Sequence, residues 1–341
     1  YNRLFMSVYT RVERPQLEAF LHNFNAGELV DYVGISAGIE NTNYFASTMR
    51  DGVQHDYVLT LFERLTAEQL PFYLYLMKHL AQRGVAVPDP QADRHGEILH
   101  SVNGKPAAVV NKLRGKSQLA PQAVHCAALG TALAHMHLAG RDFNRSQPNL
   151  RGLPWWNETV PVVLPFLEPA QANLLRSELA YQNHIAALPV YAALPRGPVH
   201  ADLFRDNAMF DGETLTGFFD FYFAGVDSFL FDVAVCMNDW CINLASGTHD
   251  ATRAEHFLAA YEDVRPFTAA ERQLLPAMQR AGALRFWISR LWDFHLPREA
   301  AMLTPHDPTH FERVLRGRLN LDANTAANPP AVLLHPTAQT A

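Results

Sequence analysis

The first third of the chain alternates apolar and polar positions, which is the pattern of strands with one buried face. Asp51-Gly52 and Asn103-Gly104 separate neighbouring runs, and such pairs favour tight hairpin turns because both residues tolerate a positive φ. The pattern therefore predicts antiparallel strands joined by short turns. The strands that it predicts cover residues 30–35, 43–49, 56–62, 98–102 and 107–113.

Elsewhere apolar residues recur at three- and four-residue spacing, as on one face of a helix. The predicted helices cover residues 16–24, 70–82, 121–139, 167–188, 230–243, 253–263, 269–294 and 310–319. A sheet-rich first third followed by helices predicts an α+β, bilobal fold with its cleft near the junction. We expect an N-terminal lobe at residues 1–110, an interlobe linker at 111–117, a helical C-terminal lobe at 118–321 and a flexible tail at 322–341.

The composition is that of a globular enzyme, with 48% hydrophobic and 18% charged residues in 341 positions. The net charge of −6, without a basic block, argues against a nucleic-acid partner. No uninterrupted apolar stretch approaches the ~18 residues that a membrane-spanning helix needs, so we predict no membrane span. The three cysteines, Cys126, Cys236 and Cys241, lack zinc-ligand spacing, so we expect reduced thiols and a cytoplasmic protein. We expect the protein to be a monomer or a homodimer. Met6 is a candidate natural start, preceded by residues 1–5.

The segment from His200 to Asp220 carries the chemistry. It contains His200-Ala-Asp202, then Asn207, then a strand-like run that ends at Asp220, with a hairpin signal at Asp211-Gly212 between them. Phosphoryl transfer needs a carboxylate beside the attacking hydroxyl and oxygen ligands for magnesium. Asp202 suits the catalytic base, and Asn207 and Asp220 suit the metal ligands. The alternative is a capped turn, but three such groups around one loop and hairpin favour catalysis.

This arrangement resembles that of the aminoglycoside/choline kinase-like phosphotransferases, which share the protein-kinase-like fold. Ala201 stands where protein kinases have arginine, and Tyr222 follows Asp220-Phe221 where they have glycine. The resemblance extends from about Glu13 to about Leu319. It implies ATP and Mg²⁺ as cofactors and a small alcohol as the acceptor.

Some stretches are more similar to the members of this family that phosphorylate L-homoserine in threonine biosynthesis. They are residues 38–44, 57–63, 199–207 and 220–225. The resemblance implies transfer of the γ-phosphate of ATP to the hydroxyl of L-homoserine, giving O-phospho-L-homoserine. Choline, ethanolamine or another small alcohol remains an alternative acceptor.

The resemblance also implies a nucleotide site in the first lobe. Its expected residues are Ser36, Gly38, Asn41 and Thr42 in the loop over the phosphates, Ile35 and Val58 over the adenine ring, and Asn111 and Leu113 at the linker. Kinases of this plan have a lysine on the third strand, whereas this chain has Thr60. The cation that neutralises the phosphates is therefore left open, and a nucleotide-binding pseudokinase is a further alternative.

Three residues around the catalytic loop have two interpretations each. His200 is expected to hold the loop through hydrogen bonds, although a proton-transfer role is also conceivable. Arg205 either contacts the γ-phosphate or pairs with an acid. Asp232 matches the acid that braces the catalytic loop in the family, and it also suits a helix N-cap.

The substrate residues are expected in the helical lobe. Arg285 lies in an apolar stretch where a cation requires a partner, so it is the first candidate to clamp the carboxylate of homoserine. Trp240 and Trp292, with Trp287, could instead form an aromatic box for the quaternary ammonium of choline. Tryptophans at helical spacing are also common in cores, so both interpretations stay open.

Overall fold

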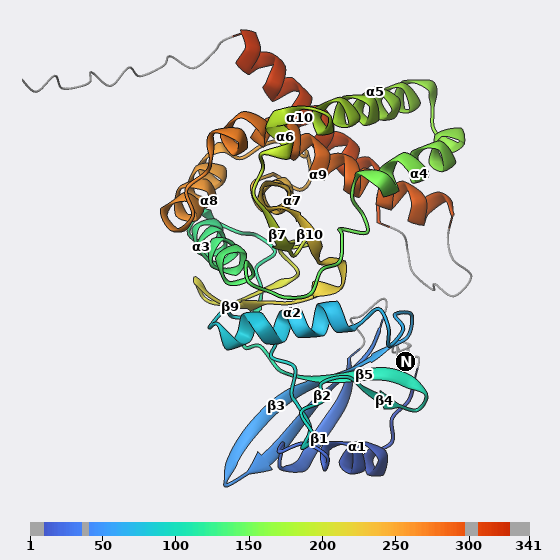
Figure 1. Ribbon diagram of the computed structural model, residues 1–341, viewed down its shortest axis with the longest axis vertical. Helices are drawn as coiled ribbons and strands as arrows, with labels where there is room; N and C mark the ends of the chain where they lie inside the picture. The colour runs from blue at the N-terminus through green and yellow to red at the C-terminus, as the bar shows by residue number, and fades with distance from the viewer. Residues whose placement is uncertain (1–9, 36–40, 297–305, 328–341) are drawn as a thin grey trace, which may run out of the picture.

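The computed structural model describes residues 10–35, 41–296 and 306–327, of which 322–327 are described as backbone only. The molecule has two lobes, a smaller one built on a sheet and a larger one built mainly of helices (Figure 1). The predicted bilobal α+β fold is confirmed.

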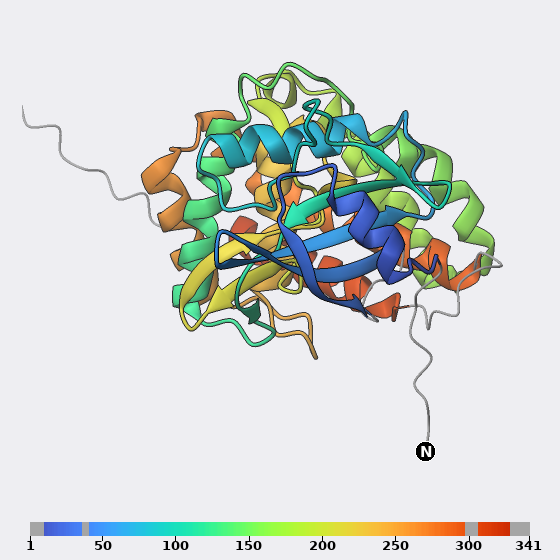
Figure 2. The ribbon, with the colours of Figure 1, turned by 90° about the horizontal axis from the view of Figure 1, so that it is seen from below.

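A five-stranded antiparallel sheet in the order β1-β2-β3-β5-β4 forms the smaller lobe. Helix α1 lies against one face, and α2 lies between the sheet and the helical lobe (Figures 1 and 2). The turns at Asp51-Gly52 and Asn103-Gly104 have positive φ at all four residues, as predicted. The bounds are α1 Arg14–Leu21, β1 Glu28–Ile35, β2 Asn41–Arg50, β3 Val53–Phe62, α2 Pro71–Gln82, β4 His100–Val102 and β5 Lys105–Asn111.

The two faces of this sheet have different partners. Tyr44 and Leu59 are buried in the cluster that packs under α1. Phe62 and Ala108 belong to the larger cluster, which includes α2 and the helical lobe. Because strand side chains alternate, Val58 and Thr60 share the face of Phe62, toward the other lobe. That face is turned toward the helical lobe and is called the cleft face below.

The helical lobe is organised around α7, Phe229–Trp240, all twelve residues of which are buried. Its longest helix, α9 Ala269–His295, begins with a capping box in which Thr268 and Glu271 each accept the other's backbone N–H. Helix α9 packs against α7 on one side and α10 on another. The other bounds are α3 Ala123–Ala139, α4 Leu153–Val163, η1 Leu164–Phe166, α5 Pro169–Ala186, α6 Pro189–Ala192, α8 Ala251–Val264 and α10 Thr309–Ala327.

Two small sheets carry the catalytic segment. Strands β6 Lys116–Ser117, β8 Ala208–Asp211 and β9 Thr214–Phe218 form one sheet, and β7 Arg196–Val199 pairs with β10 Gly225–Ser228 in the other. The short helix η2, Phe221–Phe223, connects them. Because β6 forms the end of the expected linker, residues 111–117, and pairs with β8, the linker is tied to the catalytic hairpin.

Helices α1, α2, α3, α5, α7, α8 and α9 lie within a few residues of the predicted positions, whereas α10 begins as predicted and extends past its predicted end at residue 319. The tail expected from residue 322 is corrected in part, because α10 continues to Ala327; residues 328–341 lie outside the described part. Helix α4 was not predicted, since Pro154 and Pro161 interrupt its pattern. Within the described ranges, no helix combines the length and the hydropathy that crossing a membrane requires.

Candidate active site

The catalytic loop, residues 200–207, follows β7, and the carboxylate of Asp232 holds its first two residues. Asp232, in the first turn of α7, accepts the backbone N–H of His200 at 2.7 Å and that of Ala201 at 2.8 Å. Ala201 has a φ of +62°, a left-handed conformation that costs a residue with a side chain about 1 kcal/mol. The two hydrogen bonds hold it there. Asp232 is fully buried, and its placement suits the predicted bracing role.

The side chain of His200 joins the loop to the next strand. Its Nε2 lies 2.8 Å from the carbonyl of Phe219 and therefore donates to it, while its Nδ1 accepts the backbone N–H of Asp202 at 3.3 Å. Burial lowers the pKa of His200, which favours the neutral ring that this pattern requires. The geometry supports the holding role for His200 rather than proton transfer.

The three groups predicted to carry the chemistry lie around one point. The Asn207 side-chain amide donates to the backbone carbonyl of Asp202 at 2.8 Å and approaches its Oδ2 at 3.5 Å. The N–H of Phe219 donates to the Asn207 carbonyl at 2.9 Å, which brings the following residue, Asp220, beside Asn207. Asp220 itself has a φ of +68°. The base candidate and the two ligand candidates are thus brought together.

The donor set fits magnesium. The amide nitrogen of Asn207 is engaged with Asp202, so its Oδ1 is the atom that remains for a cation, and Asp220 follows the residue bonded to the Asn207 backbone. No group of three or more His, Cys, Asp or Glu side chains suited to a metal occurs among the described residues. Mg²⁺ is commonly held by one or two carboxylates together with substrate phosphates and water, so this sparse set is the expected kind.

The nucleotide residues divide between the two faces of the sheet. Ile35 pairs with Asn43 across β1 and β2, and Val58 pairs with Val110 across β3 and β5, so Ile35 and Val58 lie on the cleft face. Asn41 begins β2 beside the predicted phosphate loop. Ser36 and Gly38 lie outside the described residues.

Thr42 lies on the face opposite the cleft. It is fully buried, and its hydroxyl accepts the N–H of Thr10 and donates to Glu63. The prediction that Thr42 contacts the nucleotide does not fit this placement. Thr60 is on the cleft face, where its hydroxyl donates to Asn43 Oδ1 at 2.8 Å. Thr60, at the strand position where kinases of this plan have lysine, therefore forms a neutral hydrogen-bonded pair with Asn43.

The linker residues are placed by the chain around them. The Asn111 side chain accepts the N–H of Asp89 at 2.5 Å, which fixes the start of the linker. Leu113 packs over Gly217 of β9, so closely that a Cβ on that glycine would lie 2.9 Å from its methyl groups. Asn111 and Leu113 thus lie where β5 passes over to the catalytic hairpin.

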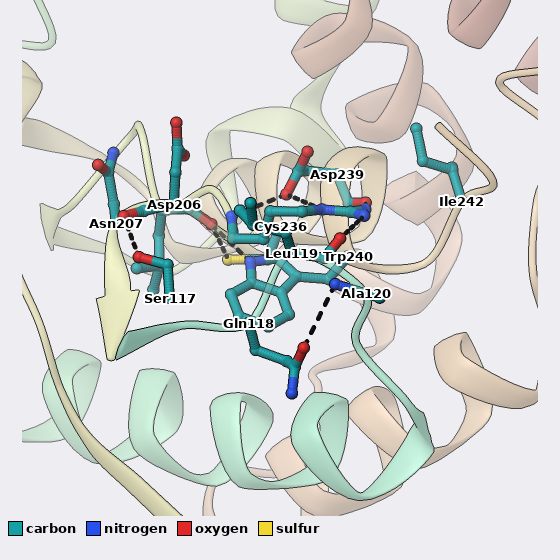
Figure 3. Close-up of polar contacts among 12 residues, drawn as sticks. Ser117, Gln118, Leu119, Ala120, Asp206, Asn207, Cys236, Asp239, Trp240 and Ile242 are labelled. Atoms are coloured by element: carbon teal, nitrogen blue, oxygen red, sulfur yellow. Dashed lines mark hydrogen bonds and ion pairs between the residues drawn. The ribbon is translucent and has the colours of Figure 1, made fainter. Parts of the chain in front are cut away.

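Of the two interpretations of Arg205, the structure supports pairing with an acid and not contact with the γ-phosphate. Its backbone N–H and its Nε both donate to Asp239 Oδ2, at 2.8 and 3.1 Å, and its Nη1 donates to the carbonyl of Leu119 at 3.0 Å. Its Nη2 donates to the Asp239 carbonyl. Figure 3 shows Asp239 and Leu119 at this contact. The guanidinium is buried and occupied, so it braces the loop against α7 rather than reaching a phosphate. Asp239 lies in the apolar run of residues 229–240, which indicates a buried acid, but the sequence does not identify Arg205 as its partner.

Trp240, expected among the substrate residues, lies in the core instead. It is fully buried, and its indole N–H donates to the carbonyl of Leu203 at 3.0 Å (Figure 3). Trp287 is also fully buried. An aromatic box that uses these two rings is therefore excluded. Trp292 is half-buried on α9 and packs against the core.

Arg285 is brought to the catalytic loop by α9. Phe286, its neighbour, packs on Phe204 of the loop with ring centroids 4.5 Å apart. Arg285 is 3% exposed, and its Nε and Nη2 have no hydrogen-bond partner among the residues that the structure describes. Burial lowers the pKa of Arg285 to about 10, although the charge of Asp202 opposes this shift. The group therefore stays charged at neutral pH.

Comparison with known proteins identifies the class. A model of the phosphotransferase enzyme family matches residues 31–275, and the chain belongs to this family. The homoserine kinase of Polaromonas naphthalenivorans is 66% identical over 314 residues, which cover 92% of this chain and 98% of that protein. The homoserine kinase of Ralstonia nicotianae is 56% identical over 330 residues, covering 95% and 99%.

Solved structures agree on the fold. Amicoumacin kinase hAmiN, in complex with AMP-PNP, Ca²⁺ and Ami, has a TM-score of 0.66 at 15% identity, covering 92% of this chain and 94% of that one. A choline kinase from Cryptosporidium parvum has a TM-score of 0.64 at 11% identity, covering 92% and 97%. At these identities the likeness concerns the fold alone.

Proposed function

We propose that this protein is a homoserine kinase, which transfers the γ-phosphate of ATP to the hydroxyl of L-homoserine and yields ADP and O-phospho-L-homoserine. Homoserine kinases 55–66% identical over most of the chain support the choice of substrate. The observation that carries the reaction type is the convergence of Asp202, Asn207 and Asp220 around one loop.

The roles follow from the geometry. The substrate hydroxyl oxygen attacks the γ-phosphorus, the bond to the β–γ bridging oxygen breaks, and Asp202 accepts the hydroxyl proton. Asn207 Oδ1 and the Asp220 carboxylate would hold Mg²⁺, which would offset the negative charge of the β- and γ-phosphates. Asp232 and His200 keep the loop in place through the hydrogen bonds described above.

The nucleotide occupies the cleft face of the sheet. Ile35 and Val58 cover the adenine ring, and the backbone at Asn111 and Leu113 meets its polar edge. Asn41, the first residue of β2, lies next to the phosphates. Thr60 supplies no positive charge there, so the cation that takes the place of the strand lysine is another group.

The alternatives are less well supported. The fully buried Trp240 and Trp287 cannot surround the ammonium group of choline. A pseudokinase has no need for a base and two metal ligands around one point.

The experiment is an ADP-release assay with ATP and Mg²⁺ and, in turn, L-homoserine, choline, ethanolamine and methylthioribose. Turnover with L-homoserine, and ³¹P NMR detection of its phosphate ester, are expected. Turnover with choline alone would contradict the proposal, and nucleotide binding without turnover on any acceptor would favour the pseudokinase.

A further inference from the structure

Arg285 differs from the other buried arginines in what surrounds it. Arg205 meets Asp239, Arg265 meets Glu271, and Arg318 meets the side chain of Asn238 and the carbonyl of Met237. The guanidinium of Arg285 instead lies over the faces of two aromatic rings. Its Cζ lies 3.8 Å from the centroid of Phe286 and 5.0 Å from that of Phe223.

Such a group is costly without a ligand. A buried charge that lacks a partner loses its hydration, and each unsatisfied N–H adds to the loss. Ring faces compensate only in part, because a cation–π contact is weaker than a charge-assisted hydrogen bond. Residues that persist at a cost to stability commonly serve function.

The position of Arg285 relates it to the reaction. Phe223 follows Asp220 by three residues, and Phe286 packs on Phe204, two residues after Asp202. The charge of Asp202 acts on Arg285. The unpartnered Nε and Nη2 therefore lie in the part of the molecule to which the acceptor hydroxyl must come.

We propose that Arg285 binds the carboxylate of the acceptor, and that this contact restricts the enzyme to alcohols that also carry a carboxylate. The inference rests on the proposed function. Nε and one terminal nitrogen form the planar fork that matches the two oxygens of a carboxylate. The acceptor thereby supplies the partner that the folded protein lacks, and its hydroxyl is directed to Asp202.

The test compares two acceptors in three proteins. L-homoserine carries the carboxylate, and 3-amino-1-propanol has the same chain, hydroxyl and amine without it. The proteins are wild type, Arg285→Met and Arg285→Lys, with Arg272→Gln as the matched control, since Arg272 is an exposed arginine on the same helix. Kinetics with each acceptor and with ATP are measured, together with thermal unfolding with and without L-homoserine.

Arg285→Met should lower kcat/KM for L-homoserine by about 30-fold or more, mainly through KM, because a buried charge pair is lost. Its kcat/KM for 3-amino-1-propanol and its KM for ATP should stay near wild type. Without ligand, its melting temperature should rise by about 2 °C, because a buried unpaired charge is removed. L-homoserine should stabilise wild type but not this variant. Arg285→Lys should recover part of the activity, and Arg272→Gln should match wild type.

Three results would overturn the inference. An equal loss with both acceptors would show that Arg285 acts on folding or on the loop. A rise in the KM for ATP would assign the guanidinium to phosphate. A lower melting temperature of the ligand-free Arg285→Met protein would mean that the arginine serves stability. If wild type turned over no L-homoserine, the proposed function itself would fail, and that result is separate from all three.

Discussion

Asp232 accepts the backbone N–H of His200 at 2.7 Å across 32 residues of sequence, so the first turn of α7 determines where the catalytic loop begins. The same carboxylate accepts the N–H of Ala201 and meets Nε2 of His137 at 3.1 Å. Hydrogen bonds, chiefly to His137 and His200, lower the pKa of Asp232 against the effect of burial. A charged, fully buried acceptor is therefore shared by the loop and by α3.

Asp232→Asn should lower both stability and kcat. Asparagine has a single acceptor oxygen, so at least one of the two loop N–H groups would face an NH₂ group. An unsatisfied buried group costs about 1–3 kcal/mol, and the loop around Ala201 would relax. Urea unfolding and steady-state kinetics measure the two effects. A variant with wild-type kcat and wild-type stability would contradict the bracing role.

Asp202→Asn should reduce kcat by about 10²–10⁴-fold, the usual contribution of a general base, and leave the KM for ATP little changed. The Asn207 side chain donates to the backbone carbonyl of Asp202, which the substitution keeps. Asp206→Asn is the matched control, because Asp206 is an exposed carboxylate in the same loop. If Asp202→Asn kept wild-type kcat, as the Asp206→Asn control should, another group would accept the proton.

Much of the fold and part of the site could be predicted from local pattern. The hairpin turns depend on adjacent residues, and Asp202, Asn207 and Asp220 lie along one strand–loop–hairpin, so they converge through short-range geometry. The partner of Arg205 depends on how α7 packs under the loop, 34 residues away, which no local pattern encodes. Likewise, alternation shows that Thr42 and Thr60 are on opposite faces of the sheet, but only tertiary packing decides which face meets α1.

Arg205 and Asp239 should behave as a structural pair. Both side chains are less than 10% exposed, so Arg205→Gln and Asp239→Asn should each cost about 3–5 kcal/mol of stability, and the double variant should cost less than their sum. The KM for ATP should remain near wild type in protein that is still folded. A double-mutant cycle in urea provides the coupling energy. An increased KM for ATP in Arg205→Gln without loss of stability would restore the phosphate contact.

Trp240→Phe should cost about 2 kcal/mol, because the substitution removes a hydrogen bond to Leu203 and leaves a cavity in a fully buried site. The ratio of kcat/KM for L-homoserine to that for choline should not change, since the ring lies in the core. Trp292→Phe is the comparison, because Trp292 is half-buried. A changed acceptor ratio in Trp240→Phe alone would contradict its placement.

His310 should make the protein less stable in mild acid. It is 8% exposed, and burial, followed by the charges of Arg290 and Arg313, lowers its pKa to about 4. An unfolded histidine has a pKa near 6.5, so between these values the unfolded state binds a proton that the folded state does not. The contribution of neutral His310 to the free energy of unfolding is therefore fully present above about pH 6.5. It is lost as the pH falls toward 4, at up to about 1.4 kcal/mol per pH unit.

Urea unfolding at about pH 7.5 and pH 5 should show a smaller loss of stability for His310→Gln than for wild type. Exposed His256→Gln should keep the wild-type loss, and an equal loss in all three proteins would exclude His310 as a source of this pH dependence.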